Sequence, residues 1–243
     1  MEQDRIASLD ALILCGGFGT RLNEVNKGRP KPMVEIHGRP FLDILIQYVS
    51  SFGFRRFILC TGFKSEVIEE YFCKKNDGNT YAISKEQEAL GTGGGIKNAE
   101  ACNLSSPFMV LNGDSICRID LKGFVEFHEA NNATASMALA MTDDARSYGL
   151  VSINDKQEVE EFNEKSSQTM RSGLVNAGIY LFEKKIMKKL VAKQKISLEH
   201  EVLPLLIGER LFGFTTKARL FDIGTPARLE LLRSHFLTTG QIR

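Results

Sequence analysis

Short apolar runs alternate with helical hydrophobic patterns through the first half of the chain, and this alternation restricts the possible folds more than any other feature. Ala11–Cys15 is a continuous apolar run, typical of a strand buried on both faces. Residues 42–52 carry apolar side chains at helical spacing, Gly53 is placed to end that helix, and Phe57–Thr61 has the pattern of the next strand. Repeated strand–helix units predict a parallel sheet with right-handed crossovers.

The rest of the chain extends this order and then departs from it at Thr134. Before that residue we expect helices over Glu66–Cys73 and Leu121–Asn131, and strands over Tyr81–Ser84 and Pro107–Leu111, with a Gly-rich loop after the first of these strands. Beyond it we expect four strands, over Ala135–Met141, Leu150–Ile153, Glu158–Asn163 and Leu174–Phe182. We then expect two helices, over Lys184–Lys193 and Ser197–Ile207, followed by a hairpin-like stretch over Leu211–Phe221 and a closing helix over Pro226–Phe236. The alternating side chains of Glu158–Asn163 suit a sheet edge.

These elements predict an α/β fold that is Rossmann-like, with a mostly parallel mixed sheet flanked by helices. No linker, repeat or low-complexity segment interrupts the sequence, so we expect one domain over residues 1–243. Its first half, to about residue 114, has the pattern of a nucleotide-binding unit. The second half, residues 115–243, would supply the other wall of a cleft.

The charge and the cysteine content exclude several classes of function. The formal net charge of +1 gives no support for nucleic acid or an anionic membrane as a partner. The five cysteines form no C-x-x-C pair, so we expect neither a disulfide framework nor a zinc site. The first residues lack the apolar core of a signal peptide, and no apolar run reaches the roughly 18 residues of a membrane span. A soluble, cytoplasmic protein is the expectation.

The first strand runs into a glycine-rich turn that carries one arginine, Leu12-Ile-Leu-Cys-Gly-Gly-Phe-Gly-Thr-Arg-Leu22. A dinucleotide fingerprint requires a small residue where Leu22 stands, and a P-loop requires a Lys-Ser or Lys-Thr pair that this turn lacks. Backbone N–H groups of such a turn can still hold phosphate oxygens, and Arg21 could add a charge-assisted contact. Taken alone, these residues are equally compatible with a tight turn that binds no ligand.

A lysine between two prolines follows this turn, in Pro30-Lys31-Pro32-Met33. The prolines favour an extended, rigid segment, which would hold the ammonium group of Lys31 toward a fixed anion. An exposed surface lysine is the alternative for this residue taken alone.

Together these motifs resemble the signature of the sugar-1-phosphate nucleotidyltransferases, also called nucleotide-sugar pyrophosphorylases. The matching motifs occur in the order of that family along almost the whole chain: Gly16–Leu22, Pro30–Met33, Glu88–Gly94, Leu111–Asp114, Tyr148-Gly149, Glu164-Lys165, Asn176–Gly178 and Asp222–Pro226. The segments "LCGGFGTRL", "LGTGG", "LNGDS" and "SLEHEVLP" are most similar to the branch of D-glycero-α-D-manno-heptose 1-phosphate guanylyltransferases.

Three positions depart from the common pattern of the family. Glu24-Val25-Asn26 replaces the frequent Pro-Leu-Thr, Ser166 follows Lys165 where many members have proline, and Phe221 stands where mannose-type members have tryptophan.

The resemblance implies a nucleotide-diphospho-sugar transferase fold of the GT-A-like type and a reaction in which a sugar-1-phosphate oxygen attacks the α-phosphorus of a nucleoside triphosphate. Such a reaction depends on positioning and on neutralisation of negative charge. By resemblance, Arg21, Lys31 and Lys165 are the catalytic residues, and Asp114 and Asp222 hold a Mg²⁺ ion. Helix capping is the alternative role for Asp222.

The resemblance also implies two sets of binding residues. The nucleotide-binding set is Leu14, Gly16, Gly17, Glu86, Glu88, Gly91 and Thr92. The sugar-binding set is Asn112, Gly113, Gly149, Glu164 and Asn176. A carboxylate can accept hydrogen bonds from guanine N1–H and the 2-amino group together; Glu88 is preferred over Glu86 for this role, and a solvated surface charge is the alternative for each.

The expected partners are GTP and a sugar 1-phosphate, with D-glycero-α-D-manno-heptose 1-phosphate preferred, mannose 1-phosphate with GTP second, and glucose 1-phosphate with UTP, dTTP or CTP third. A non-catalytic sugar-nucleotide sensor is disfavoured because the charged site residues are present. A glycosyltransferase is disfavoured because only Asn112-Gly113-Asp114 stands where an Asp-x-Asp motif would be expected. The strands of the second half could mediate a homodimer.

Overall fold

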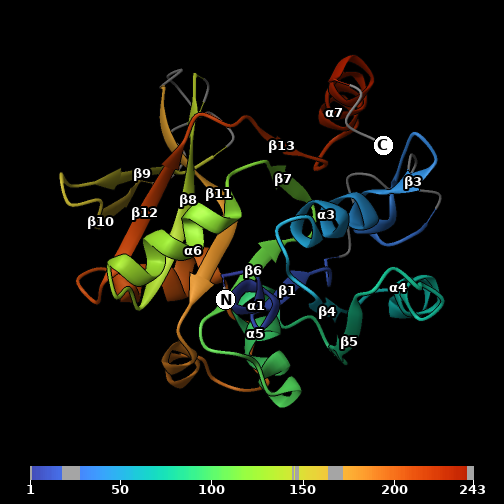
Figure 1. Ribbon diagram of the computed structural model, residues 1–243, viewed down its shortest axis with the longest axis horizontal. Coiled ribbons are helices and arrows are strands. Elements are labelled where there is room, and N and C mark those ends of the chain that lie inside the picture. The colour runs from blue at the N-terminus through green and yellow to red at the C-terminus, as the bar shows by residue number, and fades with distance from the viewer. Residues whose placement is uncertain (1, 18–27, 144, 146–147, 164–171, 240–243) are drawn as a thin grey trace.

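A nine-stranded mixed sheet forms the centre of the molecule in a computed structural model that describes residues 2–17, 28–143, 145, 148–163 and 172–239. Along the sheet the strands follow the order β10-β9-β11-β6-β1-β4-β5, and β8 joins β11 to β12. Their bounds are β1 Asp10–Leu14, β4 Arg56–Thr61, β5 Thr80–Lys85, β6 Phe108–Asn112, β8 Ala135–Thr142, β9 Leu150–Ile153, β10 Val159–Asn163, β11 Gly173–Phe182 and β12 Leu211–Thr216. Figure 1 shows β4 and β5 at one end of this sheet and β9, β10 and β12 at the other.

The first half of the sheet is parallel. Strand β1 pairs with β4 on one side and β6 on the other, and β4 pairs with β5, all in parallel register. Strand β11 then pairs antiparallel with β6. The predicted mixed sheet with flanking helices is confirmed, and the carboxyl ends of β1 and β6 meet at one edge, where ligands of such folds bind.

Helices cover both faces of the sheet because adjacent residues of each central strand point to opposite sides. Ala11 and Ile13 of β1 pack into a core with α3, α4, α6 and α7, whereas Leu12 packs into a second core on the other face with α5 and several short helical turns. The bounds of the helices are α1 Glu2–Ala7, α3 Phe41–Ser50, α4 Ser65–Phe72, α5 Gly91–Asn98, α6 Leu121–Ala130 and α7 Pro226–Thr239.

Short helical turns and small strand pairs complete the fold. The turns are η2 Lys31–Met33, η3 Ala99–Cys102, η4 Lys184–Lys189, η5 Leu198–Val202 and η6 Leu203–Leu206, and of these only η5 is a π-helical turn, the others being 3₁₀. The two small pairs are β2 Glu35–Ile36 with β3 Arg39–Pro40, and β7 Ser115–Cys117 with β13 Leu220–Asp222.

Three local predictions were wrong. The Gly-rich segment after β5 is the helix α5 rather than a loop. The stretch Leu211–Phe221 is no hairpin, because β12 pairs with β8 and β13 pairs with β7. Lys31 lies in a 3₁₀ turn, and only Pro30 before it is extended. In the first two cases a contact with a distant segment overrides the local pattern, whereas the turn at Lys31 is closed by local hydrogen bonds from Met33 and Val34.

No helix within the described ranges is long and apolar enough to cross a membrane.

Candidate active site

Two adjoining cavities lie beside the carboxyl ends of β1 and β6. The larger cavity has a volume of about 590 Å³ and the smaller about 480 Å³. The smaller cavity is lined by the predicted nucleotide-binding residues Leu14, Gly16, Gly17, Glu86, Gly91 and Thr92, and the larger by Gly149, Asn176 and Asp222. Four residues line both cavities: Lys31, Asn112, Asp114 and Glu199. Most of the predicted site residues that the structure describes therefore gather in one connected space.

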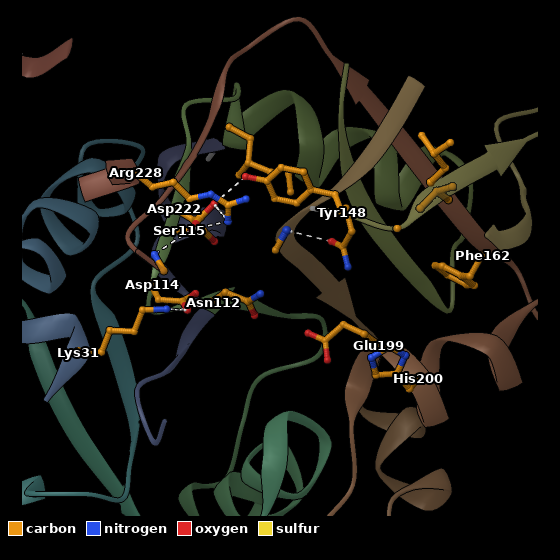
Figure 2. A pocket seen from close by; sticks show the side chains of 18 residues that line it. Lys31, Asn112, Asp114, Ser115, Tyr148, Phe162, Glu199, His200, Asp222 and Arg228 are labelled. Carbon is orange, nitrogen blue, oxygen red and sulfur yellow. Dashed lines mark hydrogen bonds and ion pairs between the residues drawn. The ribbon is translucent and has the colours of Figure 1, made fainter. Parts of the chain in front are cut away.

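Pairing of β7 with β13 brings Asp114 and Asp222 together, although they lie far apart in the sequence. Asp222 is paired with Ser115, the residue after Asp114. The Ile223 N–H also donates a hydrogen bond to the carbonyl oxygen of Asp114 at 3.0 Å. Both carboxylates face the larger cavity, as Figure 2 shows.

The Asp222 carboxylate is held by three groups. The Tyr148 hydroxyl donates to Oδ2 at 2.6 Å, the Gly224 N–H donates to Oδ1 at 2.8 Å, and Arg228 Nη1 lies 3.0 and 2.9 Å from the two oxygens. Burial alone would raise the pKa of Asp222, but the hydrogen bonds from Tyr148 and Gly224 and the charge of Arg228 outweigh it and lower that pKa. Asp222 is therefore ionised at neutral pH.

Asp114 forms an ion pair with Lys31, which η2 places at the boundary between the two cavities. The Lys31 side chain is only 14% exposed, whereas that of Asp114 is 42% exposed. Each of the two carboxylates thus has a basic partner: Lys31 for Asp114 and Arg228 for Asp222 (Figure 2).

The donor set at the two aspartates suits a hard cation that takes most of its ligands from elsewhere. Within the residues described, no three His, Cys, Asp or Glu side chains cluster as a metal site. Two carboxylates leave most of an octahedral sphere for phosphate oxygens and water, which is the usual way in which proteins bind Mg²⁺. Asp114 and Asp222 could therefore hold Mg²⁺ with a bound phosphate.

Amide groups form the wall between these carboxylates and the rest of the larger cavity. Asn112 Oδ1 is buried and accepts no hydrogen bond from the described part of the chain, so it is available to a ligand. Asn176 is more occupied: its Nδ2 donates to the Tyr180 oxygen at 2.7 Å and its Oδ1 accepts from the Gly178 N–H at 2.9 Å. Gly178, with φ of +70°, leaves room for Asn112, because a Cβ there would lie 2.8 Å from Asn112 Nδ2.

Gly113 lies behind this wall rather than in it. It lines neither cavity, and a Cβ at this position would lie 2.5 Å from the carbonyl oxygen of Leu14. Gly113 therefore permits close packing against β1, and the prediction that it contacts the sugar is not supported by its position.

The two candidate base-reading carboxylates differ in position. Glu86 is buried in the wall of the smaller cavity, and its Oε2 accepts a hydrogen bond from the Leu90 N–H at 3.0 Å. Burial raises the pKa of Glu86, against the opposing effect of that hydrogen bond. Glu88 is exposed and lines neither cavity. The position of Glu86 in the cavity wall favours it over Glu88 as the residue that contacts a base, and the preference for Glu88 stays an untested prediction.

The glycines of α5 serve a packing role, and Gly91 also lines the smaller cavity. A Cβ at Gly91 would lie 2.6 Å from the Ile196 carbonyl oxygen, and one at Gly94 would lie 2.5 Å from that of Gln194. The Gly93 N–H also donates to the Ile196 carbonyl oxygen at 2.9 Å. These glycines let residues 194–196 approach the first turn of α5, so the N-terminal N–H groups of this helix are partly used by the chain itself.

Two functional candidates lie in the site that sequence reasoning did not single out. Arg228 stands in the first turn of α7, where a positive charge is unfavourable beside the helix dipole; that placement was a signal that it has an acidic partner. Glu199 belongs to the "SLEHEVLP" segment, and its position between the cavities depends on how η5 packs against α5.

Three predicted site residues lie outside the described residues: Arg21, Glu164 and Lys165.

Known proteins resemble this chain in sequence and in fold. The profile of the Nucleotidyl transferase family matches residues 10–230. The chain is 38% identical over 223 residues to the D-glycero-alpha-D-manno-heptose 1-phosphate guanylyltransferase of Campylobacter jejuni, covering 90% of this chain and 96% of that protein. It is 35% identical over 219 residues to the enzyme of the same name from Aneurinibacillus thermoaerophilus, covering 90% and 94%.

A longer relative and a solved structure extend the comparison. The Mannose-1-phosphate guanylyltransferase of Mycobacterium tuberculosis is 33% identical over 225 residues, which are 90% of this chain but only 62% of that protein. The crystal structure of HddC from Yersinia pseudotuberculosis complexed with GMP-PN matches with a TM-score of 0.82 and 35% identity, covering 94% of this chain and 99% of that one. The chain belongs to the nucleotidyl transferase family.

Proposed function

We propose that this protein transfers GMP from GTP to D-glycero-α-D-manno-heptose 1-phosphate, giving GDP-heptose and pyrophosphate. The observation that carries this proposal is the identity of 35% and 38% to two heptose 1-phosphate guanylyltransferases over 94% and 96% of their lengths. The two connected cavities supply a site of the required kind, with room for a nucleotide and for a sugar phosphate.

Mannose 1-phosphate is the second candidate acceptor. The mannose-1-phosphate guanylyltransferase relative is nearly as similar in sequence, at 33% identity, but this chain spans only 62% of its length. The heptose preference follows from this difference in coverage.

In the proposed reaction the nucleotide lies in the smaller cavity and the sugar phosphate in the larger one. A phosphate oxygen of the sugar forms a bond to the α-phosphorus of GTP, the bond from that phosphorus to the bridging oxygen breaks, and pyrophosphate leaves. The nucleophile is already an anion, so the protein needs to align the reactants and offset their charge. Lys31 lies where the two cavities meet and is placed to neutralise the α-phosphate.

The same proposal assigns the remaining site residues. Glu86 would accept hydrogen bonds from the guanine edge. Asp114 and Asp222 would hold Mg²⁺, which when bound offsets charge on the phosphate oxygens. Following the family resemblance, Arg21 would bind the triphosphate, Lys165 the sugar phosphate and Glu164 the sugar hydroxyls.

Labelled GTP tests the reaction class. With α-³²P-labelled GTP and heptose 1-phosphate, we expect the label in a GDP-sugar, and with γ-³²P-labelled GTP we expect it in pyrophosphate. Release of the γ-label as inorganic phosphate would show hydrolysis, and its appearance on the sugar would show phosphoryl transfer. Either result, with no label in pyrophosphate, would overturn the proposal.

A further inference from the structure

Glu199 occupies the junction of the two cavities, and the roles proposed above do not include it. It is the second residue of η5, and it lines both the larger and the smaller cavity. In Figure 2 its carboxylate points across the cavity toward Asn112, on the opposite side from the Asp222 and Arg228 pair. A carboxylate in this position meets whatever ligand fills the space.

One oxygen of this carboxylate is fixed by the protein. Glu199 Oε2 accepts hydrogen bonds from the Thr92 hydroxyl at 2.8 Å and the Ser197 hydroxyl at 3.2 Å. The Thr92 oxygen in turn accepts from the Leu198 N–H at 2.7 Å. These linked hydrogen bonds hold the side chain in one orientation before a ligand arrives, which is the requirement for a selective contact.

The other oxygen, Oε1, has no hydrogen-bond partner among the described residues, and Glu199 lines both cavities. Within the described residues, no hydrogen bond reaches Oε1 and no basic side chain forms an ion pair with Glu199. An ionised carboxylate only accepts hydrogen bonds, and it repels a phosphate group. The ligand group that suits Oε1 is therefore a neutral donor such as a hydroxyl.

Two hydroxyl-bearing groups could reach this junction, the ribose of the nucleotide and the ring of the acceptor sugar. Thr92, which binds Oε2, lines only the smaller cavity, so the fixed oxygen is on the nucleotide side. His200, the next residue of η5, lines only the larger cavity. Glu199 itself also lines the larger cavity, where the sugar is proposed to bind, so its unoccupied oxygen is available to a ligand there.

We propose that Glu199 is a specificity-determining residue that accepts hydrogen bonds from hydroxyl groups of the acceptor sugar, and that Thr92 and Ser197 are its positioning residues. The proposal rests on the proposed function, because it takes the larger cavity as the sugar site. A site built to bind a hydroxyl group also discriminates against ligands that lack it, since a buried acceptor is then left unpaired.

Calorimetric binding of GDP and of GDP-mannose separates sugar recognition from nucleotide recognition. The dissociation constant of GDP divided by that of GDP-mannose reports the contribution of the sugar alone. A smaller value of this ratio means weaker recognition of the sugar. In E199A and E199Q we expect this ratio to fall about 10- to 100-fold while the affinity for GDP changes little, as for loss of a hydrogen bond to a charged group. T92V should lower the same ratio by a smaller factor, because the carboxylate stays but is less well oriented.

The matched control is E201Q. Glu201 lies on the same turn, is exposed and lines neither cavity, and its Oε1 accepts from the Ser197 N–H at 2.7 Å. This variant removes an equal charge two residues away and should leave the ratio unchanged. E199Q keeps the shape of the side chain, so it carries the test if E199A fails to fold.

Equal weakening of GDP and GDP-mannose in the Glu199 variants would contradict the proposal and assign the carboxylate to the ribose or to packing. A wild-type protein that binds GDP-mannose no more tightly than GDP would also contradict it. Because no turnover is needed, failure to form GDP-heptose would overturn the proposed function and leave this ratio interpretable.

Discussion

The hydroxyl of Tyr148 donates a hydrogen bond to Asp222 at 2.6 Å, while the guanidinium of Arg228 contacts both oxygens of the same carboxylate. Arg228 also lies 5.3 Å from the centre of the Tyr148 ring. These contacts fix the orientation of Asp222 and keep it ionised, as the proposed Mg²⁺ site requires.

Replacing Tyr148 by phenylalanine tests this arrangement. We expect Y148F to lower the free energy of unfolding near neutral pH by about 1–3 kcal/mol, the contribution of a hydrogen bond to a charged group. The pKa of Asp222 is lowered in the folded state, so this contribution is present above the pKa of the unfolded chain and is lost as the pH falls through the folded value. Urea denaturation from neutral pH down to about pH 2 measures the difference between Y148F and wild type.

Y81F is the matched control for activity. Tyr81, on β5, donates a hydrogen bond to Asp77 at 2.7 Å. Neither residue lines either of the two cavities of the candidate site. We expect Y148F to reduce kcat about 10-fold, corresponding to about 1.4 kcal/mol, and Y81F to leave it unchanged. If the free energy of unfolding of Y148F differed from that of wild type by the same amount at all pH values, the linkage to the ionisation of Asp222 would be contradicted.

Replacing Gly94 by alanine tests the packing of residues 194–196 on α5. The added methyl group would meet the Gln194 carbonyl oxygen at 2.5 Å and Leu90 Cβ at 2.8 Å, so we expect a loss of about 1–3 kcal/mol in the free energy of unfolding. G17A is the control, because no atom of the described residues lies within 4 Å of a Cβ there. Equal unfolding midpoints for the two variants would show that the approach of these segments is not tight.

The proposed contact of Glu86 with guanine predicts that GTP binding depends on pH. Because burial raises the pKa of Glu86, lowering the pH protonates it before ordinary surface carboxyl groups, and the neutral form accepts guanine donors less well. We expect the dissociation constant of GTP to rise as the pH falls through this raised pKa in the wild type. In E86Q, which keeps an acceptor for the Leu90 N–H, binding should be weaker at neutral pH and independent of pH. An unchanged pH dependence in E86Q would exclude Glu86 as the titrating group.

Metal removal should abolish turnover. We expect chelation to stop pyrophosphate release and added Mg²⁺ to restore it, and D114N to reduce the rate about 10²–10³-fold by analogy with loss of one transition-state contact. D114N should also weaken Mn²⁺ binding in the presence of nucleotide, measured by electron paramagnetic resonance. D155N, on an exposed turn away from both cavities, should match wild type. Full activity of the chelated protein would contradict the metal assignment.

The central strands could be predicted from the sequence because their signal is local. The predicted Ala11–Cys15 and Pro107–Leu111 each differ by one residue at each end from the observed strands Asp10–Leu14 and Phe108–Asn112. Both faces of these central strands pack against helices, so nearly every residue is apolar and the pattern does not depend on the rest of the chain.

Helix α5 could not be predicted in this way. Four of its first five residues are glycine, which disfavours an isolated helix. Its stability comes from contacts with residues 194–196, about a hundred positions later in the chain. The position of Glu199 depends on the same contacts, so it could not be inferred from local sequence either. Asp114 and Asp222 were paired by the family resemblance, and the pairing of β7 with β13 supplies the physical basis.

The central claim is the choice of acceptor, and the most direct measurement is kcat/KM for D-glycero-α-D-manno-heptose 1-phosphate and for mannose 1-phosphate, each with GTP. Pyrophosphate release gives both values under one set of conditions, with UTP and glucose 1-phosphate as a third pair. The proposed function predicts the highest value for heptose 1-phosphate and little turnover of the third pair. A higher value for mannose 1-phosphate, or strong turnover of UTP with glucose 1-phosphate, would contradict it.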